Sequence, residues 1–331
     1  MPCALPVIAA PMAGGPSTPA LVAAVSDAGG FGFLAAGYQT ASRLSDSIAD
    51  VRRHIDAPFG VNLFVPGADD SDEDAIAAYT AGLAAEARRL GVELGKPRWN
   101  DDDYPAKLDL LVDADVHLVS FTFGVPAPHD IDRLHRSGTQ VAITVTSADE
   151  AREAARAGAD LLVVQGVEAG GHQGTFDQHR VAQTPLRALL AEVREATELP
   201  LLAAGGIGTR EEARSVIAAG AVAVQLGTAL LCTPEAGTSQ VHRNALLERT
   251  FEDTELTRAY SGRWARGLTN RFVTEHRDAP GGYPQLHHVT RPLRAAGTLA
   301  GDPDVPSLWA GTAWRASVAA SAADVVRAIA P

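Results

Sequence analysis

The sequence predicts a closed (β/α)8 barrel with a helical substrate-side insertion after the last strand. Short apolar runs alternate with amphipathic helical stretches along the 331 residues, and this alternation is typical of βα units around a parallel sheet. Eight runs are strand candidates, and continuous apolar ones such as residues 161–164 suit a sheet covered on both faces. This count favours a closed TIM barrel. An open doubly wound sheet remains the alternative.

The strand candidates follow one another through most of the chain. We expect them at residues 6–10, 31–35, 59–63, 117–121, 140–144, 160–165, 200–204 and 222–226. Helix starts support this phasing, because Thr18 precedes a proline as an N-cap residue does. Ser147 with Glu150, and Thr209 with Glu212, have the spacing of capping boxes after predicted strands.

Two stretches do not fit simple barrel units. Residues 66–115 are expected to form a helical excursion, and the acidic run at 69–74 is the solvated start of its first helix. Residues 233–300 are expected to be a helical lobe over the barrel mouth. The predicted division is therefore a barrel of residues 1–232 with 301–331, and a substrate-side lobe of residues 233–300.

The charge balance excludes some kinds of partner. Lys and Arg number 28 against 40 Asp and Glu, a net charge of −12, and this argues against nucleic acid and anionic membranes. Two cysteines allow no disulfide framework. The first residues do not resemble a signal peptide, and no apolar run approaches the ~20 residues of a membrane span. We therefore expect a cytoplasmic enzyme that does not contact a membrane.

Active sites of such barrels lie at the carboxyl ends of the strands. Gly205-Gly206 follows the seventh predicted strand, and Gly227-Thr228 follows the eighth. Glycines let main-chain N–H groups approach an anion closely, and these two loops commonly form a phosphate site. The two loops together therefore predict a phosphate site, although each glycine pair could serve only as a tight turn.

Other strand ends carry neutral polar side chains. Asn62, Gln165 and Gln225 could donate and accept hydrogen bonds at the rim of a heteroaromatic ring, or could only cap their own strands. Met12 could lie against a flat ring or pack in the core. His172 follows Gly170-Gly171, a flexible approach to the mouth, and is the best candidate for a general base. The remaining histidines lack metal-ligand spacing, so no metal site is expected.

These motifs together resemble the class I nitronate monooxygenases, also called 2-nitropropane dioxygenases. The resemblance covers nearly the whole chain. It includes residues 9–15, 59–62, 166–172, 203–208, 225–228, 261–263, 265–267, 283–284 and 309–311. Flavin enoyl-thioester reductases share the glycine loops and the histidine, so the resemblance is more specific for the cofactor than for the reaction.

The resemblance implies a function and a set of binding residues. It implies FMN held by Asn62, Gln165, Gly170, Gly206, Gln225, Leu226, Gly227 and Thr228, with Met12 near the ring. It implies His172 as catalytic base, and oxidation by O2 of alkyl nitronates, or of neutral nitroalkanes deprotonated first, to carbonyl compounds and nitrite. Trp264 and Tyr283 are expected on the substrate side. Trp264, His287-His288 and Thr312 depart from the family pattern.

Three other functions remain open at this level. An NAD(P)H-dependent enoyl-thioester reductase is the first, a non-catalytic flavin carrier or sensor the second, and a phosphate-sugar isomerase without flavin the third. The expected partners are a small-molecule nitronate and O2. For the assembly, the sequence leaves a homodimer open.

Overall fold

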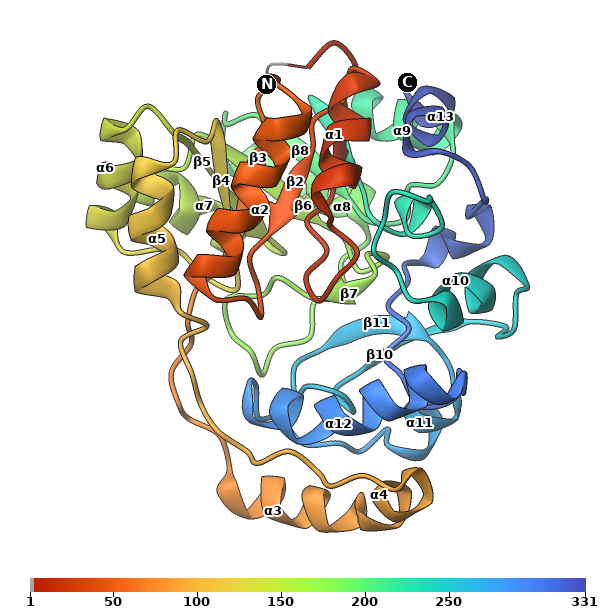
Figure 1. The fold of residues 1–331 in the computed structure, drawn as a ribbon. Coiled ribbons are helices and arrows are strands. Elements are labelled where there is room, and N and C mark those ends of the chain that lie inside the picture. Colours follow the sequence, from red (N-terminus) through yellow and green to blue (C-terminus); the bar gives the residue numbers. More distant parts are fainter. Residues whose placement is uncertain (1–2) are drawn as a thin grey trace.

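The computed structural model describes residues 3–331 and contains each of the eight predicted barrel strands. Figure 1 shows the barrel in the upper part of the molecule and a smaller lobe below it. The barrel strands are β1 (Val7–Ala9), β2 (Phe33–Ala35), β3 (Gly60–Phe64), β4 (Leu118–Thr122), β5 (Gln140–Val145), β6 (Leu161–Gln165), β8 (Leu201–Ala204) and β9 (Ala223–Leu226).

The strands form one parallel sheet that closes on itself. Their order is β1-β9-β8-β6-β5-β4-β3-β2. The two ends meet through a parallel bridge between Ile8 and Phe31, where the Phe31 N–H donates to the Val7 carbonyl at 2.9 Å. The prediction of a closed barrel is therefore confirmed, and the open-sheet alternative is wrong.

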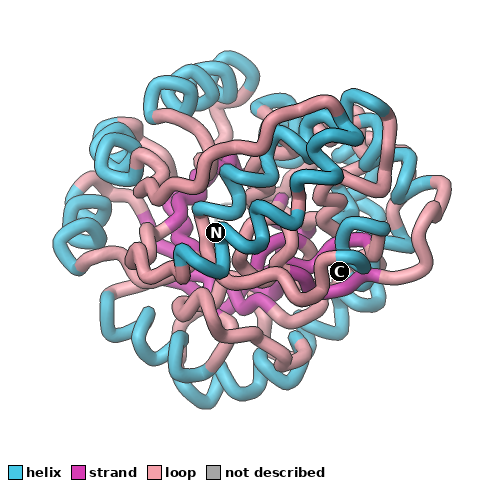
Figure 2. The backbone as a smooth tube through the Cα atoms, turned by 90° about the horizontal axis from the view of Figure 1, so that it is seen from below, coloured by secondary structure: helices cyan, strands magenta, loops and turns pink. Residues whose placement is uncertain are grey.

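Helices surround the strands, as the tube in Figure 2 shows. They are α1 (Pro19–Asp27), α2 (Ala41–His54), α5 (Tyr104–Asp113), α6 (Pro128–Arg136), α7 (Ala148–Ala157), α8 (Leu186–Ala196), α9 (Arg210–Ala218) and α13 (Ala322–Ile329). The predicted N-cap at Thr18 and the capping box of Thr209 are both present. At α7 the box is incomplete, because the Glu150 carboxylate accepts from the Thr146 N–H instead of that of Ser147.

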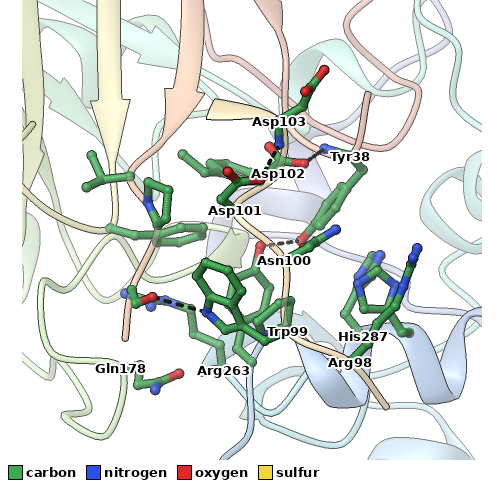
Figure 3. Close-up of a pocket in the computed structure, with 18 of the residues that line it drawn as sticks. Tyr38, Arg98, Trp99, Asn100, Asp101, Asp102, Asp103, Gln178, Arg263 and His287 are labelled. Carbon is green, nitrogen blue, oxygen red and sulfur yellow. Dashed lines mark hydrogen bonds between the residues drawn. The ribbon is translucent and has the colours of Figure 1, made fainter. Parts of the chain in front are cut away.

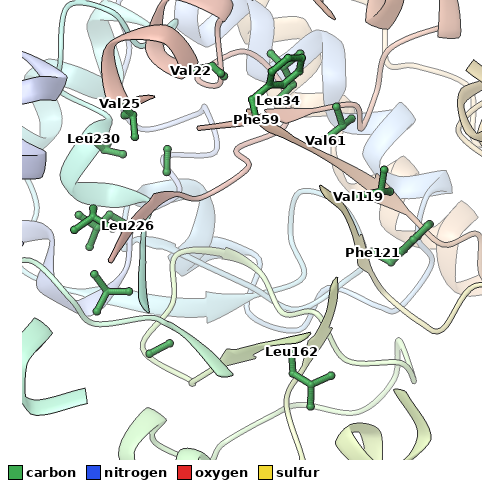
Figure 4. Packing of buried hydrophobic residues seen from close by; sticks show 14 of the residues in the cluster. Val22, Val25, Leu34, Phe59, Val61, Val119, Phe121, Leu162, Leu226 and Leu230 are labelled. Carbon is green, nitrogen blue, oxygen red and sulfur yellow. The ribbon is translucent and has the colours of Figure 1, made fainter. Parts of the chain in front are cut away.

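Alternation along the strands divides the apolar side chains between two clusters. Phe33 lies in the barrel interior with Phe31, their ring centroids 5.3 Å apart. Its neighbour Leu34 points outward, into the layer between strands and helices, because successive side chains of a strand face opposite sides. Figure 4 shows this outer layer, in which Val22 and Val25 of α1 face the sheet.

The lobe is not only helical, contrary to the expectation for residues 233–300. It contains α10 (Gln240–Leu247), α11 (Arg271–Glu275) and α12 (Gln285–Ala300), but also strands β10 (Thr254–Thr257) and β11 (Ala265–Leu268). These strands pair antiparallel, and β11 also pairs with β7 (Gly171–His172). The sequence did not reveal these strands because they are short and partly polar, and so lack the apolar residue at every second position that identifies a strand. Their pairing also depends on a distant loop.

The excursion at residues 66–115 joins this lobe. Asp72 caps α3 (Glu73–Gly82), as the acidic run predicted, and α4 (Ala84–Leu90) follows. Both helices pack against α12. Ile76 of α3 and Leu83, which lies between the two helices, share an apolar cluster with Leu286. Figure 1 shows α3 and α4 below α12. Within residues 3–331, no helix is long and apolar enough to cross a membrane.

Candidate active site

A cavity of about 990 Å³ opens at the carboxyl ends of the barrel strands. We call it the inner cavity. Nine of the residues expected to bind cofactor or to act as base line it: Met12, Asn62, Gln165, Gly170, His172, Gly206, Gln225, Gly227 and Thr228. The tenth, Leu226, has its side chain in the layer between sheet and helices, so only its main chain remains for a ligand.

The loop after β8 adopts a left-handed backbone conformation that depends on its glycines. Gly205 and Gly206 have φ angles of +114° and +67°, in the left-handed region that other residues rarely adopt. A Cβ at Gly206 would lie 2.9 Å from the Glu168 Cβ. The loop therefore leaves main-chain atoms, and no side chain, facing the cavity at this point.

The C-terminal part of the chain crosses the same loops. The Gly311 N–H donates to the Thr228 hydroxyl at 2.9 Å, and a Cβ at Gly170 would lie 2.5 Å from the Gly311 nitrogen. Gly170 is thus required by the close approach of residues 310–311. This crossing brings the Trp309 ring within 5.4 Å of the His172 ring, centroid to centroid.

The sequence analysis expected His172 to follow a flexible glycine segment, but its main chain is held in place. It belongs to strand β7 and pairs with Ala265. The Gln165 amide donates to the His172 carbonyl at 3.1 Å and accepts from the Gly174 N–H at 2.7 Å. Gln165 therefore fixes the histidine segment, a role that the sequence did not indicate.

The His172 ring is held as well. Its Nε2 lies 2.7 Å from the Ser261 hydroxyl. Burial, together with the nearby charges of Arg263 and Arg294, lowers the pKa of the imidazole to about 3. The ring is therefore neutral at physiological pH, and it holds a proton only weakly in the unliganded site. An anion bound beside it would offset the two guanidinium charges and raise its pKa.

Positive charge gathers around the inner cavity although the chain as a whole is acidic. Arg43, Arg291 and Arg294 line it, while no Asp or Glu of residues 3–331 does. Such a cavity attracts anions. Within residues 3–331, no group of three or more His, Cys, Asp and Glu side chains is arranged to hold a metal ion.

Arg263 is a buried cation whose role the sequence did not reveal. Its guanidinium donates to the carbonyls of Gln173 and Thr175 and lies 3.9 Å from the centroid of the Phe123 ring. Burial lowers its pKa to about 10. Among the described ion pairs it has no carboxylate partner, so its charge is available to an anion near His172.

The two predicted substrate-side residues have different positions. Tyr283 lies near the catalytic candidate, with its ring centroid 5.8 Å from that of His172. Trp264 is not among the described residues that line the inner cavity, and its ring lies under the Arg258 guanidinium at 4.8 Å. The sequence analysis did not predict Phe123, Ser261 or Trp309 as site residues. Phe123 directly follows β4, and a position after a barrel strand could have identified it. Ser261 and Trp309 belong to segments in which the sequence resembles the family.

Comparison with known proteins decides the family. The nitronate monooxygenase family model matches residues 3–331.

The chain belongs to the nitronate monooxygenase family. A probable nitronate monooxygenase of Staphylococcus aureus strain Newman is 35% identical over 312 residues, covering 92% of this chain and 88% of the relative. Nitroalkane oxidase from Streptomyces ansochromogenes has a similar structure, with a TM-score of 0.96 and 47% identity over 99% of this chain and 95% of that one. FabK from Thermotoga maritima is more distant, with a TM-score of 0.77 and 26% identity over 99% and 92%. The chain is thus an oxidoreductase of this family.

Proposed function

We propose that this enzyme oxidises alkyl nitronates, and neutral nitroalkanes after their deprotonation, with O2 to carbonyl compounds and nitrite, using FMN. One observation supports this most directly: the neutral imidazole of His172 faces a cavity that has glycine loops, three arginines and no acidic lining residue among residues 3–331. A nitronate is an anion, and its formation from a nitroalkane needs a base. The cavity offers both an attractive potential and a base.

The residues present fit FMN. Gly206 and the loop of Gly227 and Thr228 offer main-chain groups and a hydroxyl to a phosphate. In addition, two buried polar atoms of lining residues, Thr238 Oγ1 and His242 Nε2, have no hydrogen-bond partner within the described chain. Buried polar groups normally have a partner, so both atoms indicate a polar ligand. The bound flavin would supply the redox chemistry.

The protein's own part in the reaction would be to bind an anion and to move a proton. The positive charges of Arg263 and Arg294 lower the pKa of His172. They would therefore also attract the negative charge of a nitronate bound next to this histidine. The imidazole would take the proton from the carbon beside that group, while Ser261 keeps its Nε2 in place. Trp309 and Tyr283 pack around the imidazole and limit the access of water.

One spectroscopic experiment tests the proposal. The purified protein should show the absorbance of bound flavin, and the yellow colour should change on anaerobic mixing with the nitronate of nitroethane. In air, the same mixture should release nitrite. Rapid bleaching by NADH without any response to nitronates would instead favour the enoyl-thioester reductase, and a colourless protein that binds no FMN would contradict the proposal. Cytoplasmic location and a homodimer remain predictions.

A further inference from the structure

A second cavity adjoins the inner one. It has a volume of about 490 Å³. We call it the outer chamber, and Figure 3 shows it. The two cavities share lining residues, among them Tyr38, Phe64, Phe123 and His287. Tyr38 therefore places a polar hydroxyl group, between apolar rings, where the two cavities meet.

The Tyr38 hydroxyl has a proton to donate. Its oxygen accepts a hydrogen bond from the Tyr283 hydroxyl at 3.3 Å, and no side chain or carbonyl of residues 3–331 accepts its own proton. Burial raises the pKa of this hydroxyl to about 12, so it is neutral and keeps the proton at physiological pH. Polar groups inside proteins normally have a partner. The proton is therefore available to an oxygen atom of a ligand.

Tyr38 and His172 lie around the same space. Tyr283 connects them, since its hydroxyl bonds to Tyr38 and its ring centroid lies 5.8 Å from that of the His172 ring. The charges of Arg263 and Arg294 also act on both groups: they lower the pKa of the His172 imidazole and counteract the rise of the Tyr38 pKa. A small molecule beside His172 can therefore contact the Tyr38 hydroxyl as well.

The main chain of Tyr38 is held in a conformation that it would not adopt alone. Its φ angle is +65°, a value that bulky residues adopt only where the surroundings require it. Asp102 accepts from the Tyr38 N–H at 2.8 Å, as Figure 3 shows, and Asp103 accepts from the Ala41 N–H at 2.7 Å. Two neighbouring carboxylates thus fix both ends of the turn that carries Tyr38.

Buried contacts hold the carboxylate and the tyrosine ring in turn. Lys107 of α5 is fully buried, and its Nζ lies 2.8 Å from the Asp102 carboxylate. The Tyr38 ring stacks on the His287 ring, with centroids 4.1 Å apart and planes 7° apart, and Phe64 meets it edge-on at 5.5 Å. A donor that stabilises a developing charge needs such a fixed position, because it then needs no reorganisation during the reaction.

We propose that Tyr38 is a catalytic residue whose hydroxyl donates a hydrogen bond to an oxygen atom of the nitro group, and that Asp102 and Lys107 are positioning residues for it. This inference rests on the proposed oxidation of nitroalkanes. When His172 takes the proton, the C–H bond breaks, its electron pair forms a C=N bond, and negative charge moves onto the two nitro oxygens. The Tyr38 hydroxyl keeps its own proton and binds these oxygens more strongly as the charge develops.

Tyr38→Phe tests the donor, because it removes the hydroxyl and keeps the ring that stacks on His287. We expect kcat for nitroethane to fall by about 10- to 100-fold, the usual effect of losing a hydrogen bond to a charged group. KM should change little, since nitroethane itself is neutral. Tyr79→Phe is the matched control. The Tyr79 hydroxyl donates to the Ala259 carbonyl, and Tyr79 is not among the described residues that line either cavity.

A binding measurement tests the same contact without turnover. Propanoate has the shape of nitroethane and the negative charge of its nitronate, and it does not react. Titration calorimetry of the flavin-loaded proteins should give a Kd for propanoate about tenfold larger in Tyr38→Phe than in the wild type. Tyr79→Phe should keep the wild-type Kd. Flavin content should be the same in all three proteins.

Two double variants test the positioning residues. Asp102→Asn with Lys107→Met, and Asp102→Ala with Lys107→Met, both remove the buried ion pair. Only the variant with Asn offers an acceptor to the Tyr38 N–H. We expect it to retain most of kcat, and the variant with Ala to approach the kcat of Tyr38→Phe. Equal kcat in the two double variants would show that Asp102 does not position Tyr38.

Failure of the donor assignment can be told apart from failure of the proposed function. If the wild type consumes neither nitroethane nor its nitronate, the proposed function is wrong. If it consumes them but Tyr38→Phe equals Tyr79→Phe in kcat, the function stands and Tyr38 is not a donor to the nitro group. A lower kcat with unchanged propanoate binding would also overturn the assignment, because a donor to the nitro oxygens must meet the carboxylate oxygens as well.

Discussion

The Nε2 atom of His172 lies 2.7 Å from the hydroxyl of Ser261, although 89 residues separate the two in sequence. Ser261 belongs to the lobe, whereas His172 follows the barrel strand β6. The lobe therefore orients the candidate base of the barrel, and removing this one hydroxyl measures how much the orientation contributes.

We expect Ser261→Ala to lower kcat for nitroethane by about 2- to 10-fold, the effect of one net hydrogen bond of ~0.5–1.5 kcal/mol. KM and flavin content should change little, and Ser261→Thr should restore most of the rate. Ser137→Ala is the control, since that hydroxyl bonds only within the α6 region. A kcat equal to that of the control would show that the serine does not position the base.

His172→Asn should separate proton abstraction from the later oxidation. General-base catalysis is typically worth ~10²–10⁴-fold, so turnover of neutral nitroethane should fall severely. A preformed nitronate has already lost its proton and should be affected much less. Both substrates are assayed on one preparation with measured flavin occupancy. Equal losses would mean that His172 binds the nitro group or the cofactor instead.

Gly206→Asp should weaken FMN binding by placing a carboxylate beside the expected phosphate. Because any side chain here would also contact Glu168, Gly206→Asn is the matched variant with the same shape and no charge. Titration of the two apoproteins with FMN should give a much larger dissociation constant for Gly206→Asp than for Gly206→Asn. Equal constants would show that steric contact, and not phosphate repulsion, causes the loss.

Acidification should destabilise the protein through its buried histidines. Burial lowers the pKa of His242 to about 4, below the ordinary value near ~6.5. Between these values the unfolded chain binds a proton that the folded chain does not, so stability falls as pH falls through this window, by roughly 1–2 kcal/mol at pH ~5. The Tm of His242→Gln should decline less from pH ~7 to ~5 than that of the wild type. If Tm declined equally with pH in the wild type and the variant, His242 would not be the source of the acid destabilisation.

Tyr283→Ala and Trp264→Ala should differ, although we expected both residues on the substrate side. Tyr283 lines the outer chamber and neighbours His172, so its loss should change KM and leave flavin content intact. Trp264 instead covers Arg258, and its loss should lower Tm while KM stays near the wild-type value. Steady-state kinetics and thermal melts of both variants check this. A KM change only in Trp264→Ala would reverse the assignment.

The barrel could be predicted because its signals are local. The strand at residues 161–165 is a short apolar run, and the helix after Thr209 begins with a capping box that both sequence and structure contain. Gln225 lies near the carboxyl end of β9 and Gly206 lies in the loop after β8, so strand phasing was enough to bring both to one end of the barrel.

The rest depends on contacts between distant segments. The pairing of Ala265 with His172 turns a glycine-rich loop into a strand, and no local pattern contains that partner. Arg263 and Phe123 meet only in the folded chain. Likewise, Gln165 lines the inner cavity as expected, but its hydrogen bonds to the His172 carbonyl and the Gly174 N–H depend on a segment that no local pattern places beside it.

The contact of Gly311 with Gly170 and Thr228 also has a consequence for biosynthesis. The inner cavity needs Met12, which follows the first barrel strand, and the segment at Gly311, which comes after the last barrel strand and the lobe. A nascent chain therefore lacks a complete inner cavity until residue 311 has been synthesised, long after the last barrel strand. Truncations that end between the last barrel strand and Gly311 should accordingly yield protein that binds no FMN, although all the barrel strands are encoded.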